Sequence, residues 1–242
     1  FYQSESWAKH KSNFNWKVYR FVAYDQNDSI KSMAQCLIRF YPFNSCIISC
    51  PGGPIGDLKS FDRSFIDYLT QLLGKKYIYL RMRSMIEYNT QIIEVLTDNG
   101  WKIPKNKLTT NLTLLLNLER EESDLLNNLS KNWRRNLKRY KHDSLSIKEC
   151  ANPDINKILL LFSEMQSYKS IKIGYSKEEL ISLIQNFTKE LIIFRCEFND
   201  KLIGIRAAII NKNKAWDLLA ASNSIARKKY VSHQLLRSEE RR

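Results

Sequence analysis

The sequence predicts an α/β protein, of the α+β kind, built from two domains with mixed, largely antiparallel sheets flanked by helices. Three observations support this fold class. Alternating apolar segments of strand length and apolar residues at helical spacing recur along all 242 residues. Short turn sequences join neighbouring strands, as antiparallel hairpins require. The second half repeats the order of elements of the first half in a longer form, although no sequence repeat is visible.

The first half begins with a short helix over residues 4–11, which Ser4 can cap. The segment Pro51-Gly52-Gly53-Pro54-Ile55-Gly56 is the strongest break in the chain, because both Pro and Gly interrupt regular structure. It lacks the spacing of a nucleotide-binding glycine motif, so we interpret it as a loop between a strand and a helix. We expect strands at 17–24, 32–39, 45–49 and 77–82, and helices at 61–73 and 87–99.

The second half opens with the apolar segment LTLLLNL at residues 112–118, which predicts a buried strand. A polar stretch at 107–111 precedes it, so we place the boundary between the domains there, giving domains 1–108 and 109–242. A long basic helix is expected over 123–142. The later elements are strands at 145–149, 191–198, 202–211 and 215–222, and helices at 153–168, at 176–189 and from about 231.

The charge balance is strongly basic: 39 Lys and Arg against 25 Asp and Glu give a net charge of +14. Such a surplus favours anionic partners, although a genome rich in Lys, Asn and Ile codons would produce it as well. No segment approaches the length of apolar chain that spans a bilayer, and no signal peptide is visible. The three histidines are far apart and the five cysteines show no zinc spacing. We therefore expect a cytoplasmic protein without a metal site.

Residues 131–141 carry the densest group of cations in the chain. On a helix, Arg134 and Lys138 share one face, and Arg135 and Arg139 share another. Guanidinium and ammonium groups in this arrangement bind phosphates by charge and by paired hydrogen bonds. The alternative is a solvated basic face without a ligand, and the composition favours neither reading decisively.

Three further residues are candidates for a functional role. Arg206 breaks an apolar strand, so it must face water, a carboxylate or an anionic ligand. Tyr175 belongs to a loop with a second tyrosine and two lysines, which suits a polar ligand or an ordinary linker. Asp217 is the best single acid on a strand, unless it simply points outward. No motif for a catalytic triad or a paired carboxylate is present.

Several segments, in the same order and at matching spacing, resemble the Fem proteins, aminoacyl transferases that build the interpeptide bridge of peptidoglycan. The opening FYQSESWA resembles their F-x-Q-S-x-x-W start, and PGGPI resembles the turn that ends one of their strands. The strand TNLTLLLNL and the helix NWRRNLKRY are similar to later family motifs. The remaining matches are the segments YLRM, GIRAA and LAAS.

This resemblance implies two GNAT-like domains, of which the second is C-terminally incomplete here. It implies transfer of an amino acid from aminoacyl-tRNA to the peptide of a UDP-linked or lipid-linked muropeptide, with no cofactor and no metal. It also allows a peripheral contact with the inner face of a membrane. Arg134, Arg135, Lys138 and Arg139 would then hold phosphate or tRNA. The candidates for substrate binding are Lys9, Lys17, Arg206, Tyr230 and Tyr175.

Two departures keep other functions open. The coiled-coil arm of some Fem proteins is absent, and the glycine-rich pyrophosphate loop of GNAT enzymes has no counterpart at residues 227–232. One alternative is an acyl-CoA-dependent N-acyltransferase that acts on an amino sugar in surface polysaccharide synthesis. The other is a non-enzymatic basic module that binds RNA, which would need exposed aromatic rings beside its cations.

Overall fold

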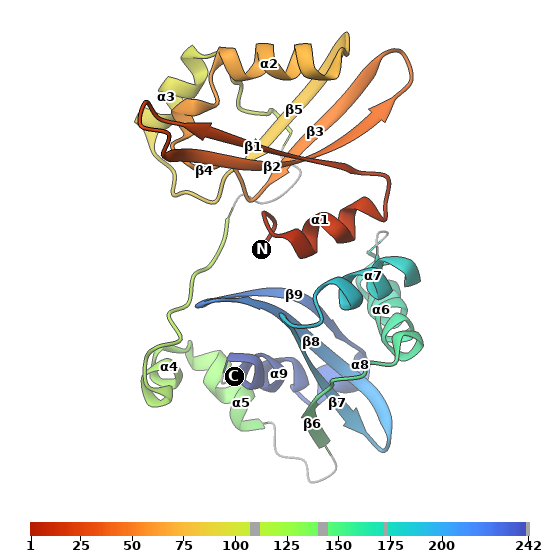
Figure 1. The fold of residues 1–242 in the computed structure, drawn as a ribbon. Helices are drawn as coiled ribbons and strands as arrows, with labels where there is room; N and C mark the ends of the chain where they lie inside the picture. The colour runs from red at the N-terminus through yellow and green to blue at the C-terminus, as the bar shows by residue number, and fades with distance from the viewer. Residues whose placement is uncertain (107–111, 140–144, 172–173, 241–242) are drawn as a thin grey trace. The chain divides into compact units, whose positions relative to one another are not determined.

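The computed structural model describes residues 1–106, 112–139, 145–171 and 174–240, and these form two compact units, 1–112 and 113–242 (Figure 1). The predicted fold class is confirmed: each unit contains a mainly antiparallel sheet with helices packed against it. The expected domain boundary at 107–111, the last residues of the expected basic helix at 140–142, and Lys172 and Ile173 of the tyrosine-containing loop lie outside the described residues.

The sheet of the first unit has the strand order β1-β2-β3-β5, with the short β4 paired to β2. β1, β2 and β3 are antiparallel neighbours, whereas β5 runs parallel to β3. A parallel neighbour needs a crossover, which α2 supplies. The strands are β1 (Lys17–Tyr24), β2 (Ile30–Tyr41), β3 (Ser45–Pro51), β4 (Ile55–Gly56) and β5 (Tyr77–Arg83).

The helices of the first unit begin where the sequence offers an N-terminal cap. Ser4 accepts the backbone N–H of Trp7, and Asp62 and Asn89 each accept two backbone N–H groups of the helix that follows. Gly74 ends α2 in the left-handed conformation that glycine adopts without strain. The helices are α1 (Glu5–Ser12), the 3-10 turn η1 (Leu58–Ser60), α2 (Arg63–Leu73) and α3 (Thr90–Asp98).

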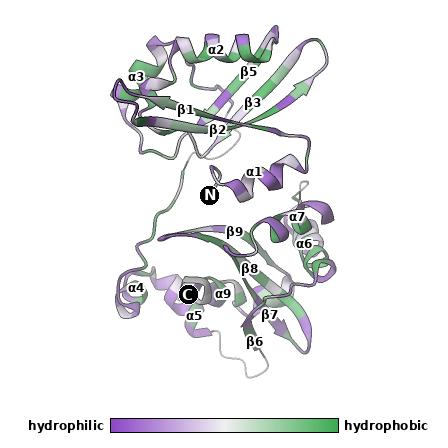
Figure 2. Cartoon of the chain, viewed as in Figure 1, coloured by the Kyte–Doolittle hydropathy of each residue, from purple (hydrophilic) through white to green (hydrophobic). Residues whose placement is uncertain are grey.

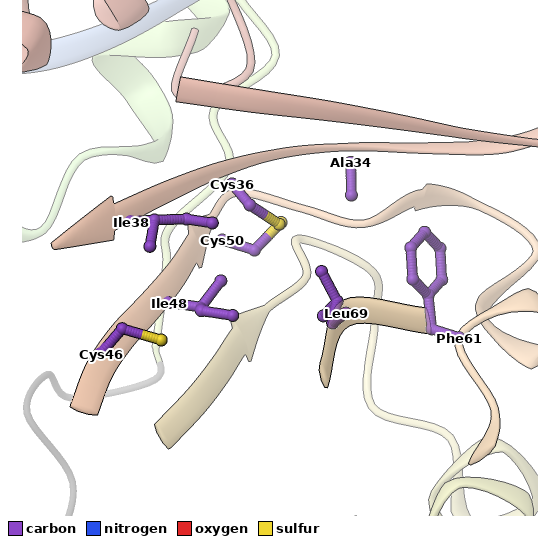
Figure 3. Close-up of a cluster of buried hydrophobic side chains, with 8 residues drawn as sticks. All are labelled: Ala34, Cys36, Ile38, Cys46, Ile48, Cys50, Phe61 and Leu69. Atoms are coloured by element: carbon purple, nitrogen blue, oxygen red, sulfur yellow. The ribbon is translucent and has the colours of Figure 1, made fainter. Parts of the chain in front are cut away.

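The core of the first unit lies between the sheet and α2, where side chains of β2 and β3 meet Phe61 and Leu69 (Figure 3). A hydrogen bond with Cys50, together with burial, raises the pKa of the Cys36 thiol, so this thiol stays protonated. All five cysteines are free. The buried side chains of this cluster are Ala34, Cys36, Ile38, Cys46, Ile48, Cys50, Phe61 and Leu69.

Gln3 ties the segment before α1 to the backbone of β2 and β3. Its side-chain amide donates to the carbonyls of Pro51 (2.8 Å) and Gln35 (3.1 Å), and its oxygen accepts the backbone N–H of Gln35 (2.6 Å). A Cβ atom at Gly53 would lie 2.7 Å from this amide, so a larger residue there would displace the Gln3 side chain. The opening segment and the Pro-Gly turn are therefore parts of one interlocked structure.

The sheet of the second unit is entirely antiparallel, in the order β6-β7-β8-β9. The turn between β7 and β8 consists of Asn199 and Asp200, which both have positive φ, as a two-residue hairpin loop requires. The register skips Leu218 of β9, because Ala207 faces Leu219 while Ala208 faces Asp217. The strands are β6 (Leu145–Glu149), β7 (Leu191–Phe198), β8 (Lys201–Asn211) and β9 (Lys214–Ser222).

Helices cover this sheet: α6 contacts β8 and β9, and α9 contacts β7 and β8. Val231 and Leu235 of α9 are buried in the core beside Gly204, where a Cβ would lie 3.1 Å from Leu235. Ser176 and Glu179 form a capping box at the start of α7. The helices are α4 (Glu122–Asn128), α5 (Lys131–Arg139), α6 (Ile155–Lys169), α7 (Lys177–Asn186), α8 (Ser224–Lys228) and α9 (Val231–Glu240).

The predicted buried strand at 112–118 is wrong. Residues 112–118 have no regular secondary structure, and the five leucines are exposed, with Leu114 completely so. Figure 2 colours much of the chain that leads into α4 as hydrophobic. Strand formation needs a partner with free backbone groups as well as apolar side chains, and the sequence pattern reports only the side chains.

The predicted single helix at 123–142 is also wrong, since α4 and α5 replace it. Leu129 takes an extended conformation (ψ 146°) and ends α4. The hydroxyl of Ser130 then accepts the backbone N–H of Trp133 and caps α5. The expected helix is therefore interrupted at Leu129, and the cations from Lys131 to Arg139 lie on α5.

Candidate anion-binding site in the second unit

The basic helix α5 is held against α9 by a small polar and aromatic cluster. The rings of Trp133 and His233 meet edge to face at 4.3 Å between centroids. Asn136, which is 8% exposed, lies with its Nδ2 3.3 Å from Nε2 of His233. In the neutral tautomer that accepts at Nε2, this contact is a hydrogen bond from the amide to the imidazole. The cluster fixes which face of α5 points outward.

Arg139 and Tyr230 form the central pair of the site. Nη1 of Arg139 donates to the phenol oxygen of Tyr230 at 2.8 Å, and the guanidinium lies 5.5 Å from the centroid of the tyrosine ring. The two residues are 91 positions apart in the sequence. The contact orients the guanidinium and uses one of its N–H donors, and the other donors suit an oxygen-rich anion.

Tyr230 occupies the residue before α9, with φ 58°. A tyrosine in the left-handed region is disfavoured, so its neighbours must hold it there. The N–H groups of the first turn of a helix have few intrahelical partners and attract negative charge. Arg139 thus lies beside the positive end of a ten-residue helix, an arrangement that favours phosphate or carboxylate.

His233 is neutral at physiological pH. Burial lowers its pKa below the ordinary value of 6.5, and a hydrogen bond with the backbone of Tyr230 opposes this only in part. A neutral imidazole can keep accepting from Asn136, whereas an imidazolium cannot. Loss of this acceptor would loosen the contact between α5 and α9.

Two further cations at the end of α8, Arg227 and Lys229, contact aromatic rings. The guanidinium of Arg227 lies 3.9 Å from the ring centroid of Tyr168, and the ammonium of Lys229 lies 4.2 Å from that of Phe198. Cation–π contacts of this length stabilise a cation without neutralising it. Together with Arg139, these residues make the region around the start of α9 basic.

Of the predicted site residues, Arg139 and Tyr230 are brought together. Arg134, Arg135 and Lys138 are exposed on α5, coloured as hydrophilic in Figure 2, and Arg135 donates to Asn132 at 2.8 Å. Their role in binding phosphate or tRNA stays a prediction.

Arg206 has a different environment from the other predicted cations. Its guanidinium pairs with Asp217 at 2.5 Å, across the β8–β9 pair, and its side chain is only 17% exposed. Of the three environments expected for Arg206, the structure contains the carboxylate. Tyr175 packs its ring against Phe162, with 5.7 Å between centroids. Whether either residue also contacts a substrate stays a prediction.

Lys9 and Lys17 belong to the first unit. Lys9 is exposed on α1 and lies 4.0 Å from the carboxylate of Glu5, a helical pair with little energetic weight. Lys17 begins β1 and places its ammonium 5.3 Å from the ring centroid of Phe40. Their predicted part in substrate binding is an expectation that these contacts leave open.

The first unit also has a cavity of about 340 Å³ between η1 and the loop before α3. Its lining includes acidic and basic residues, among them Asp57, Lys59 and Glu87. The backbone N–H of Lys59 lowers the pKa of Asp57, with Lys31 adding to the effect, so this carboxyl is ionised near neutral pH. Sequence reasoning did not identify this cavity.

Sequence reasoning also missed Asn136 and its contact with His233. A usable signal existed, because Asn136 is a polar residue between Trp133 and Leu137, near the apolar side of a helix. Buried polar side chains require a hydrogen-bond partner. The partner lies 97 residues away, and no local pattern identifies it. Within the described residues, no group of His, Cys, Asp and Glu could hold a metal ion.

No family model matches this sequence, and no curated protein matches it. Among solved structures, FemX superposes on the whole chain, with a TM-score of 0.77 over 80% of the FemX chain at 11% identity. The chain has a FemX-like fold. The expectation drawn from the Fem-like sequence segments is therefore confirmed for the fold.

Two further structures show a similar arrangement. A conserved protein of unknown function from Bacteroides thetaiotaomicron matches 99% of this chain and 77% of its own, with a TM-score of 0.58 at 12% identity. L-PGS from Bacillus licheniformis matches 93% of this chain and 66% of its own, with a TM-score of 0.51 at 11% identity. The FemX-like fold thus recurs in proteins with very different sequences. None of the helices in the described ranges combines the length and apolar character needed to cross a membrane.

Proposed function

We propose that this chain is an aminoacyl transferase, which moves an amino acid from aminoacyl-tRNA to the peptide of a peptidoglycan precursor. The observation that carries this proposal is the FemX-like fold along the whole chain, in both units. The Fem-like segments of the sequence add to it. Gln3 of the opening F-x-Q-S-x-x-W segment bonds to the backbone of Gln35 and of Pro51, the first residue of the Fem-like PGGPI turn.

The basic site of the second unit supports an anionic substrate. Both tRNA and a UDP-linked or lipid-linked muropeptide carry phosphates, which the fixed guanidinium of Arg139 and the positive end of α9 would attract. The surrounding charge of Arg227 and Lys229 would speed the encounter. The site therefore fits either substrate by charge.

The proposed reaction is an aminolysis. The acceptor amine attacks the ester carbonyl of the aminoacyl-tRNA, an amide forms, and the ribose oxygen leaves with the proton that the amine gives up. Such a reaction depends on positioning and on hydrogen bonds to the developing oxyanion. β9 pairs only with β8 among the described strands, so alternate backbone N–H groups of β9 face away from the sheet. These groups near the bulge at Leu218 are our candidates for the oxyanion donors.

A thermal-shift titration tests the proposal, because a ligand that binds only the folded protein raises its melting temperature. We expect UDP-MurNAc-pentapeptide or uncharged tRNA to raise the melting temperature of the wild type. Arg139→Gln and Tyr230→Phe should reduce the shift, since each removes one partner of the central pair. Arg120→Gln, a change of the same charge at an exposed position outside the α5–α9 contact, serves as the control.

Two results would contradict the proposal. A shift with coenzyme A alone would favour the acyl-CoA-dependent N-acyltransferase. A shift with any RNA, unaffected by Arg139→Gln and without transfer activity, would favour the basic RNA-binding module.

A further inference from the structure

The turn between β2 and β3 exposes a phenylalanine almost completely. Phe43 is 91% exposed and has φ 58°, and the next residue, Asn44, has φ 53°. Asparagine and glycine adopt this left-handed conformation readily, whereas a bulky aromatic residue does not. Phe43 therefore neither contributes to the core nor suits the local backbone, which points to a role outside the folded unit.

This turn is fixed to the start of β5. The hydroxyl of Ser45 donates to the carbonyl of Pro42 at 2.7 Å. The backbone N–H groups of Lys76 and Tyr77 both donate to the carbonyl of Asn44, at 3.1 and 3.2 Å. Figure 1 shows the β2–β3 turn beside the chain that leads from α2 into β5. Phe43 is thus presented on a defined part of the first unit.

Tyrosines and lysines lie on the segments next to the turn that carries Phe43. Tyr41 and Tyr77 flank Ser45 on the neighbouring strands and are 42% and 57% exposed. The ammonium of Lys75 lies 5.4 Å from the ring centroid of Phe40, and that of Lys76 lies 5.3 Å from the ring centroid of Tyr77. We call the set Tyr41, Phe43, Lys75, Lys76 and Tyr77 the tip surface.

The segments that build the tip surface contain no acidic residue. Neither residues 29–56 nor residues 68–86 include an Asp or a Glu, whereas the first range carries two cations and the second carries four. A concentration of positive charge around exposed aromatic rings is complementary to an anionic surface with an apolar interior. A bilayer that contains anionic lipid has both properties.

We propose that the tip surface docks the protein on a bilayer that contains anionic lipid. Phe43 inserts at the boundary between head groups and acyl chains, the tyrosines lie at head-group level, and Lys75 and Lys76 approach the lipid phosphates. This inference does not depend on the proposed transfer activity. It uses a different unit and different residues from the anion-binding site.

Sedimentation with vesicles tests the docking. We expect the wild type to bind vesicles that contain phosphatidylglycerol and not vesicles of phosphatidylcholine alone. Each lysine removed should weaken binding about fivefold, so Lys75→Gln/Lys76→Gln should bind roughly 25-fold more weakly. Phe43→Asn should also weaken binding while its melting temperature stays the same or rises, because asparagine suits the left-handed backbone. A loss of binding by this variant is then not a loss of folding.

The matched control is Lys212→Gln/Lys214→Gln, which removes the same charge at the β8–β9 turn of the second unit. It should bind anionic vesicles as the wild type does. Equal weakening by both lysine pairs would overturn the proposal, since the overall charge would then explain the binding. Wild-type binding by Phe43→Asn would overturn it as well. Binding of a single-stranded RNA oligomer with the same dependence on Phe43, in the absence of vesicle binding, would assign the surface to RNA instead.

Discussion

The two units use their surplus of positive charge in different ways. On the tip surface of the first unit, lysines lie over aromatic rings, and their ammonium groups are point charges on flexible stems. In the second unit, Arg139 donates to Tyr230 and is held in one orientation beside α9. The first arrangement suits a diffuse anionic surface, and the second suits one phosphate group at a defined position. The net charge of +14 therefore does not describe a uniformly basic protein.

The largest expected effect concerns α9, the helix that follows Tyr230 and lies beside Arg139. Leu235→Ala removes a side chain that is 1% exposed in the core between α9 and the sheet. A cavity of this kind costs about 2–5 kcal/mol of stability. We expect a lower melting temperature of the second unit by calorimetry and a loss of muropeptide binding, with vesicle binding retained. Leu72→Ala, at a position that is 45% exposed, is the control and should change stability by less than about 0.5 kcal/mol. An unchanged melting temperature in Leu235→Ala would contradict the packing described for α9.

The second prediction concerns the first unit alone. Gln3→Ala removes three hydrogen bonds to the backbone of β2 and β3 and leaves their groups without a partner. We expect a loss of about 2 kcal/mol, measured by urea denaturation. Gln71→Ala, on the exposed side of α2, should be neutral. If the two variants were equally stable, the opening segment would not be interlocked with the Pro-Gly turn.

The third prediction separates a directed guanidinium from a point charge. Arg139→Lys keeps the charge and loses the planar set of donors, so we expect muropeptide or tRNA binding to weaken about tenfold. Lys75→Arg/Lys76→Arg should keep vesicle binding within about a factor of two, because at these two positions the bilayer interacts with the charge and not with the shape of the cation. Isothermal titration and vesicle sedimentation measure the two affinities. If Arg139→Lys bound the muropeptide and tRNA as tightly as the wild type, the second unit would bind its anion by charge alone, as a point charge does.

The smallest expected effect is a dependence on pH through His233. Its pKa is lower in the folded protein than in the unfolded chain, so the unfolded chain binds more protons between the two values. The contribution of the neutral imidazole to stability is therefore complete above pH 6.5 and is lost as the pH falls through the folded pKa. We expect the melting temperature of the wild type to fall more steeply than that of His233→Gln between pH 7 and pH 5. Parallel curves would show that His233 does not carry this dependence.

Most helices and strands could be predicted, because their signals are local. β1 begins and ends at the predicted residues, and α7 begins after the predicted cap at Ser176. The two errors have different causes. Residues 112–118 have the apolar pattern of a strand but belong to neither sheet, and Ser130 caps a new helix inside a continuous helical pattern.

The candidate site could be predicted only in part. The dense cations of α5 and the tyrosine before α9 were each visible in the sequence. Their contact was not, since it depends on the packing of α5 against α9 across 91 residues. The Arg206–Asp217 ion pair follows the same rule, because strand register places Asp217 opposite Ala208, from where its carboxylate reaches the guanidinium of Arg206. Residue chemistry is readable from sequence, whereas the pairs that make a site come from the fold.

A transfer assay tests the central claim most directly. The protein is incubated with tRNA carrying a mixture of labelled amino acids and with UDP-MurNAc-pentapeptide. The masses of the products are then measured by mass spectrometry. The proposed function predicts a muropeptide heavier by one amino-acid residue, formed in the wild type and strongly reduced in Arg139→Gln. An unchanged muropeptide, together with acylation of an amino sugar by an acyl-CoA, would contradict the account.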